Sequence, residues 1–205
     1  MITIVDYGMG NLGSIQNMFK YLGIESKIES DVEKIKNASK ILLPGVGSFD
    51  TAMKKINESD LKEVLNEKAL KERVPVLGIC LGMQLLTNSS EEGGLEGLGW
   101  IPAKTFNFTD KVDRSCKVPH MGWNTVRQSN KSILTTELDE FNEAMFYFVH
   151  SYYVQVEDED NSVLKTTYGL EFDSAIQKDN IFGVQFHPEK SHKFGMKLFE
   201  NFAKI

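Results

Sequence analysis

Short apolar segments alternate with helical ones through the first ninety residues, and this alternation constrains the fold more than any other feature of the sequence. Short apolar runs that end in a turn or a helix occur at Ile2–Val5, Ile41–Leu43 and Val76–Ile79, and a further strand is expected at Ile24–Ile28. Continuously apolar strands separated by helices are typical of a parallel sheet covered on both faces. We therefore expect an α/β fold whose first half is a mostly parallel sheet with helices on both faces.

The segments between these strands carry apolar residues at the spacing that is typical of helices. Apolar residues recur at i, i+3, i+4 and i+7 from Ile15 to Leu22 and predict a helix there. The charge-rich stretch Thr51–Arg73 carries apolar residues at the spacing of one or two helices. A further helix is expected to begin near Leu81, and the segment from Phe194 to the end of the chain predicts a closing helix.

The second half of the chain has a different pattern. Short β-type runs follow one another, at Met145–Val149, Tyr152–Val156, Val163–Tyr168, Ser174–Gln177 and Ile181–Phe186. Their acidic and glycine-containing connections favour antiparallel pairs. The acidic cluster from Glu157 to Asp160 is expected to be a solvated hairpin tip. The sequence therefore predicts one domain over residues 1–205, with an open mixed sheet that is antiparallel in its second half.

Composition excludes several classes of protein. The chain has 205 residues, 23 Lys+Arg, 29 Asp+Glu and two Cys. The acidic excess argues against a nucleic-acid partner, and two cysteines exclude a disulfide-rich scaffold. The longest apolar run, Val76 to Leu86, is too short for a membrane helix. With no metal-ligand spacing and no nucleotide motif, we expect a cytoplasmic protein without cofactor, metal or membrane partner.

The pentapeptide from Gly78 to Gly82 carries the strongest candidate for a nucleophile, Cys80. A strand runs into Cys80, a helix leaves it, and glycine stands two residues away on each side. Such a sharp strand-to-helix turn exposes a nucleophile, and the helix N-terminus favours the thiolate. The alternative is a buried structural cysteine.

Two other segments follow predicted strands in the same way. His187 and Glu189 are two residues apart, so their side chains point to one side of the chain. A histidine near Cys80 could deprotonate it, and a carboxylate could fix the imidazole tautomer. The segment Pro44–Gly47 has two glycines that allow its amides to turn inward and stabilise an oxyanion. The alternatives are a surface histidine and a plain turn.

Taken together, these three segments resemble the oxyanion strand, nucleophile elbow and His-Glu pair of triad-type (class I) glutamine amidotransferases. Three segments extend the likeness to the glutaminase subunits of imidazole glycerol phosphate synthases: Val5–Asn11, Val118–Asn124 and His187–Ser191. The resemblance covers essentially the whole chain.

The resemblance implies a role for each matched residue. Cys80 would attack the side-chain amide of L-glutamine, His187 would carry the proton to ammonia, and Glu189 would orient His187. The backbone of Gly45, Val46, Gly47 and Leu81 would hold the oxyanion. Glutamine would be bound by Gln84, Glu92, Ser151 and Tyr152.

The resemblance also implies a partner. Ammonia would pass to a separate cyclase chain, a (β/α)8 barrel, in a heterodimer that makes imidazole glycerol phosphate and an aminoimidazole carboxamide ribotide in histidine biosynthesis. The residues expected to contact it are Met9, Asn11, Met121, Trp123 and Lys190. The Gly45-Val46 peptide would flip on activation, so we expect little glutaminase activity without the partner.

Two enzymatic alternatives remain open at the level of sequence. A paralogous glutaminase would feed a sugar-amidating synthase of surface-polysaccharide biosynthesis, and its motifs overlap with those above. A stand-alone cysteine hydrolase would use the same Cys-His-Glu set without a partner. A non-enzymatic interaction module is disfavoured because all three members of the set are present.

Overall fold

The computed structural model describes residues 1–109, 111–138 and 143–205 and is dominated by one mixed sheet of eleven strands. In spatial order its main path is β2 (Ser26–Glu29), β1 (Ile2–Val5), β3 (Ile41–Leu43), β4 (Val76–Ile79), β13 (Ile181–Val184), β12 (Leu170–Lys178), β10 (Tyr152–Val156), β6 (Ala103–Asn107) and β5 (Ser89–Ser90). Beside β12 lie β11 (Ser162–Tyr168) and β8 (Arg127–Gln128). A second sheet pairs β7 (His120–Thr125) with β9 (Met145–His150).

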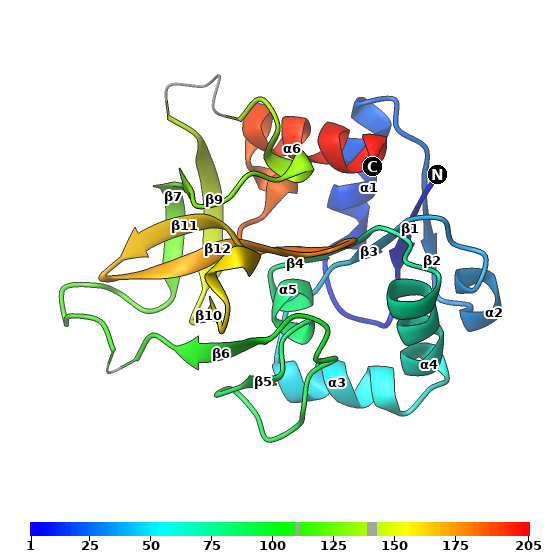
Figure 1. Cartoon of the computed structure of the whole chain (residues 1–205), viewed down its shortest axis with the longest axis horizontal. Helices are drawn as coiled ribbons and strands as arrows, with labels where there is room; N and C mark the ends of the chain where they lie inside the picture. The colour runs from blue at the N-terminus through cyan, green and yellow to red at the C-terminus, as the bar shows by residue number, and fades with distance from the viewer. Residues whose placement is uncertain (110, 139–142) are drawn as a thin grey trace.

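The parallel part of the sheet is covered by helices on both faces, which confirms the predicted fold class. Strands β2, β1, β3, β4 and β13 are parallel, and from β13 through β12 and β10 to β6 the pairings are antiparallel. Helices α1 (Leu12–Tyr21) and α6 (His192–Lys204) lie over one face (Figure 1). The other face carries α3 (Phe49–Asn57), α4 (Leu61–Asn66) and α5 (Leu81–Leu85), and α2 (Val32–Ile35) lies near the β2 edge.

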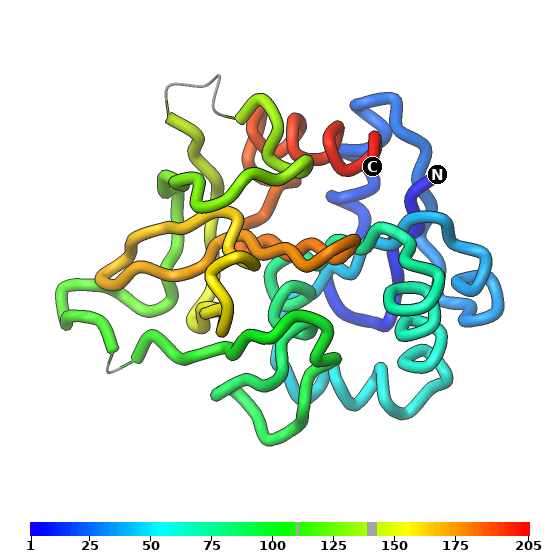
Figure 2. The backbone as a smooth tube through the Cα atoms, viewed as in Figure 1, coloured from blue at the N-terminus to red at the C-terminus, as the bar shows by residue number. Residues whose placement is uncertain are grey.

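Alternation along each parallel strand separates the core into two layers. Ile2 and Ile4 of β1 join the cluster that contains Phe19 of α1, whereas Val5 joins the cluster that contains Phe49 of α3. Figure 2 shows that the C-terminal segment returns to lie beside the N-terminal half of the chain. Continuous apolar strands are thus required here, since both of their faces are buried.

Several element boundaries differ from those expected. The second strand begins at Ser26 rather than Ile24, since the Ile24 amide still donates to Phe19 O at the end of α1. The segment 51–73 contains α3 and α4, followed by a π-helical turn at Glu67–Lys71. Strands β6 and β7 were not expected, because neither segment carries a continuous apolar run.

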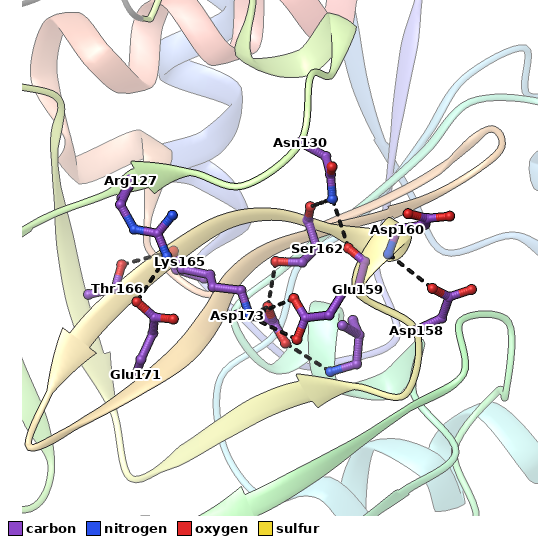
Figure 3. Close-up of polar contacts among 12 residues, drawn as sticks. Arg127, Asn130, Asp158, Glu159, Asp160, Ser162, Lys165, Thr166, Glu171 and Asp173 are labelled. Carbon is purple, nitrogen blue, oxygen red and sulfur yellow. Dashed lines mark hydrogen bonds and ion pairs between the residues drawn. The ribbon is translucent and has the colours of Figure 1, made fainter.

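The acidic segment Glu157–Asp160 is exposed but is not a hairpin tip, so that prediction is wrong. The strands it joins, β10 and β11, lie on opposite sides of β12, where Asp173 is opposite both Val154 and Lys165. Figure 3 shows the buried Asp173 carboxylate between them. It accepts hydrogen bonds from Ser162 Oγ at 2.6 Å and the Val156 amide at 2.8 Å, and Lys165 Nζ lies 3.3 Å away. A buried, fully paired carboxylate therefore connects three strands, which no local sequence pattern reveals.

No helix among the residues that the structure describes is both long and apolar enough to cross a membrane.

Candidate active site

Cys80 forms the turn between β4 and α5 in a backbone conformation that side chains rarely adopt. Its φ is 54° and its ψ is −112°, and its side chain is largely buried. Strand β4 ends at the residue before it and α5 begins at the residue after it, as the sequence predicted. A non-glycine residue in this region costs on the order of 1–3 kcal/mol and is typical of functional sites.

The two glycines of the pentapeptide allow this turn to pack against its neighbours. A Cβ atom on Gly82 would lie 1.9 Å from the carbonyl oxygen of Leu43 in β3. A Cβ atom on Gly78 would lie 2.6 Å from the carbonyl oxygen of Gly82. The close approach of α5 to β3 and β4 thus requires glycine at both positions.

Strand pairing brings His187 to Cys80. Strand β13 lies beside β4 with Val184 opposite Ile79, and the Cys80 amide donates to Val184 O at 2.8 Å. The chain then continues for two residues to His187, which lines the same cavity as Cys80. Two side chains 107 positions apart in the sequence therefore meet because the carboxyl ends of adjacent parallel strands coincide.

Glu189 holds the His187 ring. His187 Nδ1 and Glu189 Oε1 are 2.8 Å apart, and both side chains are almost fully buried. Nε2 of His187 is buried and has no hydrogen-bond partner among the described residues. Burial lowers the pKa of His187, but its interactions with Cys80 and Glu189 outweigh burial and raise the pKa to about 9. These interactions favour the positively charged form of the ring, and the contact of Nδ1 with Glu189 leaves Nε2 available for proton transfer.

A cavity of about 320 Å³ opens above Cys80 and His187. This volume is at the small end of the range for ligand sites, roughly 300–1,000 Å³. The predicted site residues that line it are Val46, Gly47, Cys80, Leu81, Gln84, Glu92, Ser151, Tyr152 and His187. Gly45 lines a smaller neighbouring cavity instead, together with His187 and Glu189.

Tyr7, which the sequence did not single out, holds the segment that contains Gly45. Its buried hydroxyl donates to the Pro44 carbonyl oxygen, and burial raises the pKa of the phenol above its usual value. A Cβ atom on Gly45 would lie 2.7 Å from that hydroxyl and 3.0 Å from Cβ of Leu81. Glycine is thus needed at position 45 for this segment to pass between Tyr7 and the turn that contains Cys80 and Leu81.

Gln84 and Gln185 form a buried amide pair beside the nucleophile. Gln84 Nε2 donates to Gln185 Oε1 at 3.1 Å and to the Tyr152 carbonyl oxygen at 3.4 Å. Gln185 Nε2 lies 3.7 Å from Cys80 Sγ. Both donor hydrogens of Gln84 are therefore used within the protein, and its Oε1 atom is the group it can offer to a ligand. The signal for Gln185 in the sequence is a polar residue in a run that is otherwise apolar.

Glu92 also lines this cavity. Its Oε2 accepts a hydrogen bond from the Phe49 amide at 2.9 Å. Burial raises the pKa of Glu92, whereas the bond from Phe49 lowers it, and the net effect is a raised pKa. The second carboxylate oxygen is left to pair with a cationic group of a ligand.

Two buried histidines lie beside the Ser151-Tyr152 segment, and one of them, His150, also lines the cavity. His120 Nδ1 and His150 Nε2 are 2.9 Å apart, and Phe108, Phe148 and Phe172 surround them. Burial lowers the pKa of His120 to about 4 and that of His150 to about 3. Both rings are therefore neutral at physiological pH.

This neutrality predicts a dependence of stability on pH. His120 and His150 have folded pKa values below the value of 6.5 expected for an unfolded chain, so each takes up a proton on unfolding at acid pH. Their contribution to stability is fully present above pH 6.5 and is lost as the pH falls toward 4, by up to ~1.4 kcal/mol per pH unit for each ring. Urea unfolding between pH 7 and pH 5 measures this loss. His150→Gln should reduce the dependence of the unfolding free energy on pH by up to ~1.4 kcal/mol per pH unit, which is the share of one ring. The same pH dependence in the variant and the wild-type chain would contradict the expectation.

Four of the five residues predicted to contact a partner are exposed, and the fifth, Met9, is partly buried. Met121 and Trp123, on one face of β7, are 62% and 43% exposed, and Trp123 stacks on His192 at 5.4 Å. Lys190 Nζ lies 5.7 Å from the Tyr147 ring. Asn11 and Lys190 line the smaller cavity that also contacts His187 and Glu189. Met9 is partly buried against the α3 side of the sheet.

Within the described ranges, no group of three or more His, Cys, Asp or Glu side chains could hold a metal ion.

Comparison with known proteins places this geometry in context. The family model described as Glutamine amidotransferase class-I matches residues 3–205. A Methanococcus maripaludis protein, imidazole glycerol phosphate synthase subunit HisH 2, is 58% identical over 204 residues that cover 100% of this chain and 99% of that protein. A Pseudomonas aeruginosa protein of the same name is 47% identical over 205 residues, covering both chains completely.

Solved structures support the fold. One titled "Crystal structure of glutamine amidotransferase" superposes with a TM-score of 0.74 at 16% identity and covers 100% of both chains. The structure of PurLQS from Thermotoga maritima has a TM-score of 0.73 at 19% identity, covering 99% of this chain and 97% of that one. At these identities the likeness concerns the arrangement of strands and helices.

Proposed function

Because the chain belongs to the class-I glutamine amidotransferase family, we propose that it is the glutaminase subunit of an imidazole glycerol phosphate synthase in histidine biosynthesis. The observation that carries the proposal is the meeting of Cys80 and His187 in one cavity, on a chain that matches relatives of that name over its full length. We infer in addition that it acts in the cytoplasm, where the substrates of such biosynthetic reactions are found.

The reaction begins with attack of the Cys80 thiolate on the side-chain amide carbon of L-glutamine. The negative charge that develops on the amide oxygen would be met by the Leu81 amide at the start of α5 and by amides of the Val46-Gly47 segment across the cavity. Gln84, Glu92 and the Ser151-Tyr152 backbone would hold the amino-acid portion of the substrate.

Proton transfer completes each half of the reaction. His187 Nε2 gives its proton to the leaving nitrogen, so that the carbon–nitrogen bond breaks, ammonia departs and a γ-glutamyl thioester remains. The same nitrogen then takes a proton from water, whose oxygen attacks the thioester and releases glutamate. Glu189 keeps the Nδ1 atom of the ring occupied throughout, which fixes Nε2 toward Cys80.

Ammonia would leave by the side of the triad that lies away from the glutamine cavity. The smaller cavity there has a volume of about 30 Å³ and joins His187 and Glu189 to Asn11 and Lys190. A molecule the size of water needs roughly 10–15 Å³, so this space is sufficient for ammonia. We propose that a cyclase subunit, a (β/α)8 barrel, covers this opening in a heterodimer and performs the lyase half of the reaction. Met9 would lie at its rim.

Glutamate release measured with and without a purified cyclase subunit tests the function. We expect low activity alone and a large increase when the cyclase and its ribotide substrate are present. Absence of glutamate release under both conditions would refute the glutaminase assignment. Full activity without the partner would instead favour a stand-alone hydrolase. The relatives reported above support neither the stand-alone hydrolase nor the sugar-amidating alternative.

Trp123 is expected to be an anchor of the partner interface. Its exposed ring is held between Tyr147 and His192, and preorganised aromatic side chains of this kind often contribute about 2 kcal/mol or more to binding. Trp123→Ala should therefore weaken association with the cyclase roughly 30-fold, as measured by calorimetric titration. Tyr21→Ala is the control, since Tyr21 is 76% exposed at the far end of α1 and should leave the affinity unchanged. Equal effects of the two substitutions would contradict this placement of the interface.

A further inference from the structure

A continuous series of hydrogen bonds runs from β7 to the wall of the glutamine cavity. Asn124 Nδ2 lies 3.2 Å from His120 Nε2, and His120 Nδ1 lies 2.9 Å from His150 Nε2. His150 Nδ1 in turn lies 2.6 Å from the carbonyl oxygen of Tyr152. The last atom belongs to the backbone that lines the cavity, and it also accepts the bond from Gln84.

The direction of every bond in this series is determined by its two ends. A carbonyl oxygen can only accept, so His150 Nδ1 must carry the proton that it shares with Tyr152. His150 is neutral, so its Nε2 can only accept, and His120 Nδ1 must donate to it. His120 Nε2 is then an acceptor as well.

The hydrogen bonds of Asn124, at the other end of the series, agree with these proton positions. The Thr125 amide donates to Asn124 Oδ1 at 2.8 Å, which identifies the second side-chain atom of Asn124 as its nitrogen. That nitrogen has two hydrogens, one directed at the Thr167 carbonyl oxygen at 3.0 Å and one at His120 Nε2. Donor and acceptor therefore match at each step, and all bonds point the same way.

We propose that Asn124, His120 and His150 are positioning residues that hold the Ser151-Tyr152 backbone where it can bind glutamine. The proposal rests on the function proposed above. Aromatic rings confine both imidazoles: His120 stacks on Phe148 and Tyr168 with centroids 4.8 Å and 4.1 Å apart. Neither ring can turn to exchange its nitrogens without losing bonds on both sides. The Tyr152 carbonyl oxygen is thus fixed by two donors, one from His150 and one from Gln84.

The electrostatic surroundings favour this neutral arrangement. The ring contacts of His120 and His150 are to each other and to Phe108, Phe148, Tyr168 and Phe172. Burial is the main reason that the pKa of His150 is lowered, and the neighbouring His120 and His187 rings lower it further because a positive charge on either would repel one on His150. His150 also lines the cavity that contains Cys80 and His187, and its hydrogen bond to the Tyr152 carbonyl oxygen connects the series to the cavity backbone.

The first test is spectroscopic and does not depend on activity. Long-range ¹H–¹⁵N correlation spectra of the ¹⁵N-labelled full chain report which ring nitrogen carries the proton. We expect both His120 and His150 as neutral Nδ1–H tautomers at pH 7, the form that is the minor one for free histidine. An Nε2–H tautomer or a doubly protonated ring at either position would overturn the proposal.

The second test separates positioning from mere filling of space. In His150→Asn the amide nitrogen replaces Nδ1 and keeps the bond to Tyr152, whereas in His150→Gln the amide reaches the Nε2 position and that bond is lost. The affinity for L-glutamine is measured by calorimetric titration of each variant in a Cys80→Ser background, which cannot turn the substrate over. We expect the Kd to rise about tenfold in His150→Gln, which corresponds to the loss of roughly one hydrogen bond, and to stay within about twofold in His150→Asn.

The order of the two variants decides the outcome. Asn is smaller than Gln and leaves the larger void, so a purely structural role for His150 predicts that Asn weakens binding more. That order, or equal weakening, would overturn the proposal. If Cys80→Ser with His150 intact binds no L-glutamine even in complex with the cyclase subunit, the proposed function fails, and the tautomer measurement still decides the question for the histidines.

Discussion

Replacing Cys80 with serine is expected to reduce glutamine hydrolysis by at least about 10³-fold, because the hydroxyl is far less readily deprotonated than the thiol. Serine fills almost the same volume and tolerates the turn, so the backbone at φ 54° should be retained. Glutamate release in the presence of the cyclase measures the loss. Circular dichroism and the midpoint of urea unfolding should match the wild-type chain, which would assign the loss to the missing sulfur.

Cys116 provides the matched control for this experiment. It is the other free cysteine and is more accessible than Cys80. Cys116→Ser should retain full activity, and a glutamine analogue with an electrophilic carbon should modify the wild-type chain once, at Cys80. Labelling of Cys116 in place of Cys80, or substantial activity in Cys80→Ser, would contradict the proposed mechanism.

Much of the candidate active site could be predicted because its position depends on where strands end. The order β3, β4, β13 places the segment after Leu43 on one side of the nucleophile turn and His187 on the other. Each of these strands is a continuous apolar run that ends in a turn or in polar residues, which is visible in the sequence alone. Once a parallel sheet is inferred, the carboxyl ends of its strands must converge.

The features that could not be predicted depend on contacts between distant segments. Asp173 and the pair His120-His150 are polar residues in strands, and nothing local distinguishes them from solvent-exposed positions. Their burial follows from pairings such as His120 opposite His150 in β7 and β9. The segment His120–Thr125 has glycine and asparagine within it, so its strand character results from that pairing rather than from its own composition.

Gly82→Ala is expected to destabilise the fold by about 3 kcal/mol or more and to abolish activity. The added Cβ would lie 1.9 Å from the carbonyl oxygen of Leu43 and 2.9 Å from its carbonyl carbon, both backbone atoms that have no rotamer to change. Helix α5 would have to move away from β3, carrying the Leu81 amide with it. The gain in helix propensity, about 1 kcal/mol, cannot offset this clash. For a chain of this length the melting temperature should fall by roughly 6–12 °C.

Gly13→Ala is the control for this prediction, since Gly13 also lies in the first turn of a helix, α1, and a Cβ there would meet nothing within 4 Å. Because the substitution restricts the unfolded chain without a clash, the melting temperature should stay the same or rise slightly. Calorimetry on both variants, with glutamate release alongside, separates a general effect of glycine replacement from the specific contact of α5 with β3. If Gly82→Ala melted like Gly13→Ala and remained active, the close packing that positions Cys80 against the oxyanion segment would not be required.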